Sequence, residues 1–183
     1  MNNSILKEMT EADLEMVRKW RNNENVRRFM YTQHEISRDE HLEWWNKITL
    51  IDSDFIPLIF EYNNKPCAFV SFSNINKKNK SASWAFYLSE DAKKGISSIV
   101  EFKALEYAFR TIFLYKLKCE VIDVNLSVIK MHKKYGFKEE GCFIDDFFNG
   151  SSYSTVHHLA LFCNEWDFQK EAIQLKLDRV WNK

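Results

Sequence analysis

Two segments in the middle of the chain combine residue types that could do chemistry. The first is a polar turn, residues 89–98, which contains Gly95 and joins an apolar run to a segment rich in Ile, Phe, Leu and Ala. Such a turn presents main-chain N–H groups at the positive end of a helix dipole, where phosphate or pyrophosphate binds well. An ordinary strand-to-helix turn also uses a glycine, so the turn alone leaves both interpretations open.

The second segment, residues 125–137, places Asn125 at the end of a predicted strand and a titratable ring, His132, further along a short predicted helix. Histidine exchanges protons near neutral pH, so His132 is a candidate proton donor. A half-buried histidine that merely packs is the other interpretation. Tyr135 lies three residues further, on nearly the same helix face, and is the alternative donor. Asn125 also fits an N-cap or turn residue.

The hydrophobic pattern predicts the elements that position these residues. Capping signals at 10–13 and 37–40 open two N-terminal helices. The remaining expected elements are strands at 55–62, 66–75 and 81–88, a helix at 96–113, a strand at 117–124, a helix at 127–134, a hairpin of strands at 138–148 and 153–163 around Asn149-Gly150, and a closing helix at about 165–181. This order predicts a single α/β (α+β) domain, residues 1–183, with a mixed sheet and helices on both faces.

Composition excludes several function classes. The formal net charge of the 183 residues is zero, whereas a nucleic-acid or anionic-membrane surface needs a basic excess. The 4 cysteines show no CxxC spacing, which favours reduced core cysteines. The chain has no apolar run long enough to span a bilayer. We therefore expect a soluble cytoplasmic protein without metal, nucleic-acid or membrane partners; a homodimer is compatible with this reading.

The two segments together resemble the GNAT superfamily of N-acetyltransferases. The family's pyrophosphate loop, Gln/Arg-x-x-Gly-x-Gly/Ala, falls on Ala92, Gly95 and Ser97, where the central glycine alone agrees. The second family motif is Asn-x-x-Ala-x-x-x-Tyr-x-x-x-Gly-Phe. Its positions are occupied here by Asn125, Val128, His132, Gly136 and Phe137, of which Val128 and His132 depart in identity.

The resemblance implies a GNAT fold, a mostly antiparallel sheet in which a central parallel strand pair splays apart. It also implies acetyl-CoA as cosubstrate and direct attack by an amine. The coenzyme-binding residues that it implies are Phe86, Leu88, Lys93, Lys94, Gly95, Ile96, Ser97, Ser98, Asn125, Ser127, Met131 and His132. The implied catalytic residues are His132, Tyr135 and Tyr87, of which Tyr87 also fits an ordinary sheet aromatic.

The N-terminal third is similar, more narrowly, to the aminosugar N-acetyltransferases of pseudaminic acid synthesis, on the segments 19–22, 29–31, 35–37 and 40–42. That resemblance implies transfer to the 4-amino group of a UDP-linked 4-amino-4,6-dideoxy sugar (UDP-4-amino-4,6-dideoxy-N-acetyl-beta-L-altrosamine). The expected acceptor-binding residues are Arg21, His41, Ser73, Asn74 and Tyr87. Arg21 also fits a solvated helix-end charge, and His41 a core histidine. The alternatives are a protein N-terminal amine or an aminoglycoside as acceptor, or a silent acyl-CoA-binding module.

Overall fold

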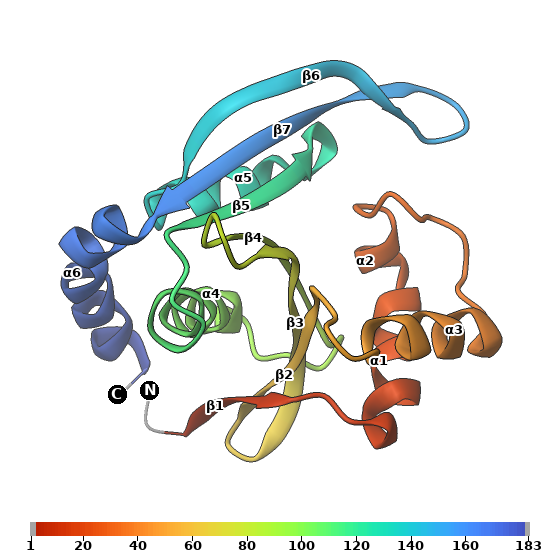
Figure 1. Cartoon of the computed structure of the whole chain (residues 1–183), viewed down its shortest axis with the longest axis horizontal. Coiled ribbons are helices and arrows are strands. Elements are labelled where there is room, and N and C mark those ends of the chain that lie inside the picture. Colours follow the sequence, from red (N-terminus) through yellow and green to blue (C-terminus); the bar gives the residue numbers. More distant parts are fainter. Residues whose placement is uncertain (1–2, 182–183) are drawn as a thin grey trace.

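The computed structural model describes residues 3–181 and contains a seven-stranded sheet (Figure 1). The strands are β1 (Ser4–Glu8), β2 (Ile56–Tyr62), β3 (Lys65–Asn76), β4 (Ser81–Leu88), β5 (Lys116–Ile122), β6 (Lys138–Phe148) and β7 (Tyr153–Phe162). Their spatial order is β1-β2-β3-β4-β5-β7-β6. Every neighbouring pair is antiparallel except β4 and β5, which are parallel. The predicted mixed, mostly antiparallel sheet with one central parallel pair is confirmed.

Helices cover both faces of this sheet (Figure 1). The helices are α1 (Leu14–Asn22), α2 (Glu24–Arg27), α3 (Arg38–Ile48), α4 (Ile96–Glu106), α5 (Leu126–Lys134) and α6 (Cys163–Trp181). Both predicted capping signals form, since Asp13 accepts from the Thr10 N–H and Glu40 from the Ser37 N–H. None of the helices within residues 3–181 is long and apolar enough to cross a membrane.

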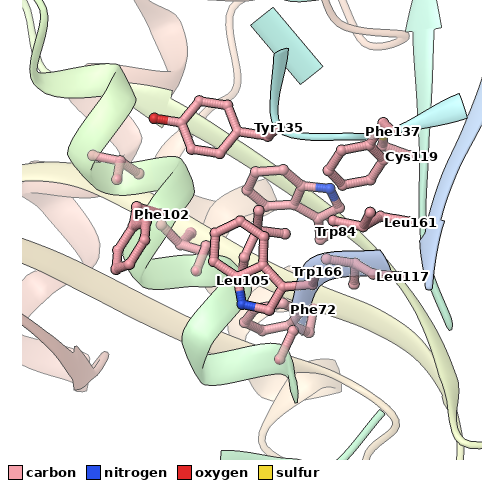
Figure 2. Close-up of a cluster of buried hydrophobic side chains, with 14 of the residues drawn as sticks. Phe72, Trp84, Phe102, Leu105, Leu117, Cys119, Tyr135, Phe137, Leu161 and Trp166 are labelled. Carbon is pink, nitrogen blue, oxygen red and sulfur yellow. The ribbon is translucent and has the colours of Figure 1, made fainter. Parts of the chain in front are cut away.

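Alternation along the strands divides the buried side chains between two cores. On β2, Leu58 and Phe60 belong to the large core beneath α4, α5 and α6, whereas Ile59 belongs to the smaller core beneath α1 and α3. Strand side chains point alternately to the two faces of a sheet, so each central strand stabilises both layers. Figure 2 shows the large core around Trp84 and Trp166, which are 3% and 0% exposed.

The observed elements differ from the sequence prediction at three places. The edge strand β1 was missed, because it has no clean alternation and is defined by pairing with β2. The helix expected at 96–113 is regular only to Glu106, after which residues 107–111 form a π-helical turn. Phe113, beyond this turn, has a left-handed φ of 52°. The closing helix begins at Cys163, slightly earlier than predicted. Residues 1, 2, 182 and 183, the ends of the expected domain, lie outside the described residues.

The parallel strands separate soon after they meet. Their register joins Ser81 to Lys116, Ala82 to Leu117 and Ser83 to Lys118, and no further pair of these strands is formed along the described chain. From Trp84 onward β4 pairs only with β3 on its other side. The predicted splay is therefore present, and it exposes main-chain groups of β4 toward a gap.

Gly136, which ends α5 before the loop to β6, should be intolerant of a side chain. Its φ is +90°, and an added Cβ would lie 1.7 Å from Gln169 Nε2, which now donates to the Tyr135 carbonyl at 2.9 Å. Gly136→Ala should therefore lower the free energy of unfolding by about 2 kcal/mol, through backbone strain and the lost hydrogen bond. Chemical denaturation measures the change. Gly141→Ala is the control, because nothing lies within 4 Å of its added Cβ. An equal effect of both variants would contradict this account.

Candidate active site

A cavity of about 620 Å³ occupies the gap between β4 and β5, within the size range of small-molecule sites. Its wall includes β4 residues from Trp84 to Leu88 and β5 residues from Cys119 to Val121. The start of α5 and one residue of α4 close one side, and the α1–α2 region closes the other. The lining residues are Asn23, Asn25, Val26, Phe29, Met30, Trp84, Ala85, Phe86, Tyr87, Leu88, Ser89, Glu90, Ser97, Cys119, Glu120, Val121, Asn125, Ser127, Val128, Met131 and His132.

Most residues expected to contact the coenzyme are brought together by this gap. Those that line it are Phe86, Leu88, Ser97, Asn125, Ser127, Met131 and His132. The others of that set, which the cavity wall does not include, are Lys93, Lys94, Gly95, Ile96 and Ser98. Two of these residues have contacts elsewhere in the protein. Ile96 is buried in the core, and the Lys93 ammonium lies 4.6 Å from the centre of a Trp181 ring.

The turn before α4 differs in detail from the predicted N–H cradle. The Ile96 N–H donates to the Lys93 carbonyl at 3.0 Å, and the Ser98 N–H donates to the Gly95 carbonyl at 3.2 Å. These two donors are already used inside the turn. Gly95 adopts φ +86°, a left-handed conformation that favours glycine. Among residues 93–98, Ser97 at the start of α4 lines the cavity.

His132 is a buried titratable side chain in the cavity wall, and its ring is held by three elements. Its Nδ1 lies 2.8 Å from Glu101 Oε1 on α4, and Cys119 on β5 interacts with the ring electrostatically. Trp84 and Phe137 pack against the ring with centroid distances of 5.3 and 5.2 Å. Burial opposes the imidazolium, but the interactions with Cys119 and Glu101 outweigh it and raise the pKa of His132 to about 10.

The two tyrosines expected at the reaction centre occupy different surroundings. Tyr87 lines the cavity and stacks on Phe69 with ring centroids 5.0 Å apart. The Tyr135 hydroxyl instead donates to the Ser98 carbonyl at 2.6 Å, and Tyr135 is not among the residues of the cavity wall. Burial raises the pKa of Tyr135, which further disfavours loss of its proton. Geometry therefore favours His132 over Tyr135 as a proton donor to a ligand in the gap.

The side of the cavity opposite α5 is built from the N-terminal helices and two carboxylates. Asn23 Nδ2 donates to Glu90 at 3.2 Å. The Tyr31 hydroxyl donates to Glu120 on β5 at 2.7 Å. No lysine or arginine is among the described residues that line this cavity. This part of the wall can therefore accept hydrogen bonds from a protonated amine.

The residues expected to bind the acceptor do not lie together at one site. Arg21 lies next to the cavity, where its charge acts on Tyr87, and its Nη2 donates to the Thr32 carbonyl at 2.9 Å. His41 is 5% exposed and stacks on Trp44, behind α1, as a core histidine would. Ser73 pairs with Ser83, at the closed end of the parallel pair, and Asn74 follows it in a bulge. Neither Ser73 nor Asn74 lies in the cavity wall.

Sequence reasoning missed Glu101 and the two carboxylates of the cavity. Glu101 had a detectable signal, because it is a charged residue between Val100 and Phe102 in a helix predicted to be buried. Glu120 and Glu90 had none. Their place in the wall depends on the splay of β4 from β5 and on contacts from the N-terminal helices, which are distant in sequence.

Comparison with known proteins decides the family. The model of the acetyltransferase (GNAT) domain family matches residues 4–138, which is most of the chain. The chain belongs to the GNAT acetyltransferase family. It is similar to a spermidine N(1)-acetyltransferase of Vibrio cholerae, at 23% identity over 91% of this chain and 97% of that one. It is also similar to the acetyltransferase PseH of Campylobacter jejuni, at 27% identity over 71% of this chain and 80% of that one.

Solved structures agree with this GNAT fold. The Vibrio cholerae spermidine N-acetyltransferase, solved in complex with CoA and spermine, superposes with a TM-score of 0.83 at 23% identity, covering 91% of this chain and 99% of that chain. The predicted class is thereby confirmed: the protein is an acetyl-CoA-dependent N-acetyltransferase with the mixed GNAT sheet. In the described part of this acetyltransferase, no group of three or more His, Cys, Asp or Glu could hold a metal ion.

The gap in this acetyltransferase suits the cosubstrate. Acetyl-CoA supplies an acyl thioester at the end of a pantetheine arm that carries amides. The main chain of β4 beyond Ser83 offers hydrogen-bonding groups on its free side, as an exposed strand edge does. The Asn125 side chain, which accepts from the Ser127 hydroxyl at 3.1 Å, offers an amide in the same wall.

Proposed function

We propose that this acetyltransferase moves the acetyl group of acetyl-CoA to the 4-amino group of a UDP-linked 4-amino-4,6-dideoxy sugar, as the resemblance of its N-terminal third to aminosugar N-acetyltransferases suggests. The observation that carries the proposal is Arg21. Its guanidinium is half-buried beside Tyr87, and its Nη1 is buried without a hydrogen-bond partner among residues 3–181. Burial lowers the pKa of Arg21, so an anion would relieve a desolvated cation there.

The proposed chemistry is direct attack of the amine on the thioester carbonyl. The two substrates would enter from opposite sides of the gap, so most of the acceleration would come from proximity and orientation. Main-chain N–H groups of β4 near Tyr87 and Leu88 would polarise the carbonyl. His132 would give a proton to the departing thiolate. The buried ring, which retains a proton at neutral pH, supports that role.

Arg21→Gln should reduce kcat/KM for the UDP-sugar about tenfold, because a charge-assisted contact to the diphosphate is lost. The measurement is release of free coenzyme A thiol, with the UDP-sugar and its nucleotide-free form compared as acceptors. The variant should not affect the nucleotide-free sugar. Lys47→Gln is the control, since Lys47 is an exposed lysine on α3. Equal rates for the two acceptors in the unaltered protein would contradict the nucleotide-sugar assignment.

A polyamine acceptor is the second candidate. The carboxylates of Glu90 and Glu120 in the cavity wall favour it, as does the similarity to spermidine acetyltransferases. Spermidine assayed beside the UDP-sugar separates the two candidates. If spermidine is the substrate, Glu120→Gln should raise its KM severalfold, because the wall of the cavity loses a negative charge that attracts the cationic amine. Rapid turnover of the UDP-sugar with no turnover of spermidine would exclude the polyamine.

A further inference from the structure

Glu101 is a charged residue in an apolar setting. It lies on α4 between Val100 and Phe102 and is 0% exposed. Its Oε1 lies 2.8 Å from His132 Nδ1, whereas its Oε2 has no hydrogen-bond partner within residues 3–181. A buried carboxylate that is satisfied at one oxygen destabilises a fold relative to an apolar side chain of similar size. Such a group needs an explanation beyond packing.

We propose that Glu101 is a positioning residue, which keeps a hydrogen on His132 Nε2 and holds that nitrogen toward the thioester in the cavity. The proposal rests on the proposed acid role of His132 and extends it to a residue outside the cavity wall. With Nδ1 occupied by Glu101, Nε2 is the ring atom left for a ligand.

His132 and Glu101 share one proton across their hydrogen bond. In one arrangement an imidazolium donates from Nδ1 to the Glu101 carboxylate. In the other, a protonated Glu101 donates to Nδ1 of a neutral ring. Nε2 carries a hydrogen in both. When Nε2 transfers that hydrogen to the departing thiolate, which becomes a thiol, Nδ1 keeps or takes the shared proton. Both routes end with a neutral His132 protonated at Nδ1 and a carboxylate at Glu101.

The surroundings hold this proton in place through neutral pH. The titratable groups that face the pair are Cys119 from β5 and Tyr135 from the end of α5. Trp84 and Phe137 cover the ring with apolar surface. Burial raises the pKa of Glu101, an effect that the hydrogen bond from His132 only partly offsets. The pair therefore releases its shared proton only in alkaline solution.

Glu101→Gln tests the proposal, because it keeps the shape of the side chain and removes the shared proton. In the unaltered protein kcat should fall as the pH rises through about 10. In Glu101→Gln the same fall should occur below about pH 7, since a neutral amide no longer stabilises the imidazolium. At pH 8 the fall in kcat should be about tenfold or more, with the KM for acetyl-CoA unchanged. Glu101→Asp should partly restore the alkaline limb.

A matched control and a direct measurement make the test decisive. Glu106 lies on the same helix, and its carboxylate accepts a hydrogen bond from Trp166 Nε1 at 2.7 Å. Glu106→Gln should leave the pH dependence of kcat unchanged. Nitrogen NMR of the histidines in the unaltered protein should show His132 Nε2 protonated, with a titration well above the ordinary histidine range. That measurement needs no turnover, so it tests the effect of Glu101 on His132 even if the proposed acceptor substrate is wrong. A His132 titration near or below 6.5, or an unmoved profile in Glu101→Gln, would overturn the proposal.

Discussion

Replacement of His132 with Asn should lower kcat about 10²- to 10³-fold, the size expected when a proton donor is lost. An asparagine amide can still donate toward Glu101 from roughly the place of Nδ1, but it offers nothing at the place of Nε2. The fold and the KM for acetyl-CoA should therefore change little. Steady-state release of free thiol at saturating acceptor measures the effect. In the unaltered protein, activity should persist as the pH rises and fall only near pH 10, where His132 loses its proton.

Tyr135→Phe is the comparison that makes this result specific. The Tyr135 hydroxyl donates to the Ser98 carbonyl, so its loss should reduce stability by about 1 kcal/mol and leave kcat near the original value. If His132→Asn retained full kcat while Tyr135→Phe lost it, the tyrosine would be the donor and the assignment of His132 would be wrong.

Ser97→Asp should weaken binding of coenzyme A about 30-fold without loss of the fold. Ser97 is the second residue of α4 and lies in the cavity wall. A carboxylate there would stand near the expected pyrophosphate, and two like charges about 5 Å apart repel by about 3 kcal/mol at an effective dielectric constant of 20. Screening by salt reduces this repulsion to about 2 kcal/mol, which corresponds to the 30-fold loss. An acidic residue in the first turn of a helix is favourable for the helix itself. Titration calorimetry with coenzyme A measures the affinity.

Two comparisons separate charge from shape in this experiment. Ser97→Ala should bind coenzyme A with nearly the original affinity, because it removes the hydroxyl and adds no charge. A short acetyl thioester without phosphates should react equally well with Ser97→Asp and with the unaltered protein. An equal loss for the short thioester would mean that the aspartate disturbs the gap as a whole, and not a phosphate site.

The sequence predicted the centre of the fold better than its edges. Gly95, Asn125 and Gly136 each stand at an element boundary, where a local conformational need leaves a residue-type signal. The strand β4 was located with the observed bounds because its hairpin and turn signals are local. The edge strand β1 has no such signal; its pairing with β2 is a long-range contact.

The site was predicted in part for the same reason. Residues of the coenzyme side lie on β4 and α5, within the segments that carry the family motifs. The opposite wall places Phe29 and Met30 in the same cavity as β5, about half of the chain away in sequence, and no local pattern reports such a long-range arrangement. The main-chain cradle was over-predicted, because residue spacing does not show that the Ile96 and Ser98 N–H groups bond within the turn.

Titration of the unaltered protein with coenzyme A in a calorimeter shows whether the space between β4 and β5 holds the pantetheine arm. We expect saturable heat with one site per chain, and the affinity should fall in Ser97→Asp. The absence of saturable heat at millimolar coenzyme A would contradict this expectation.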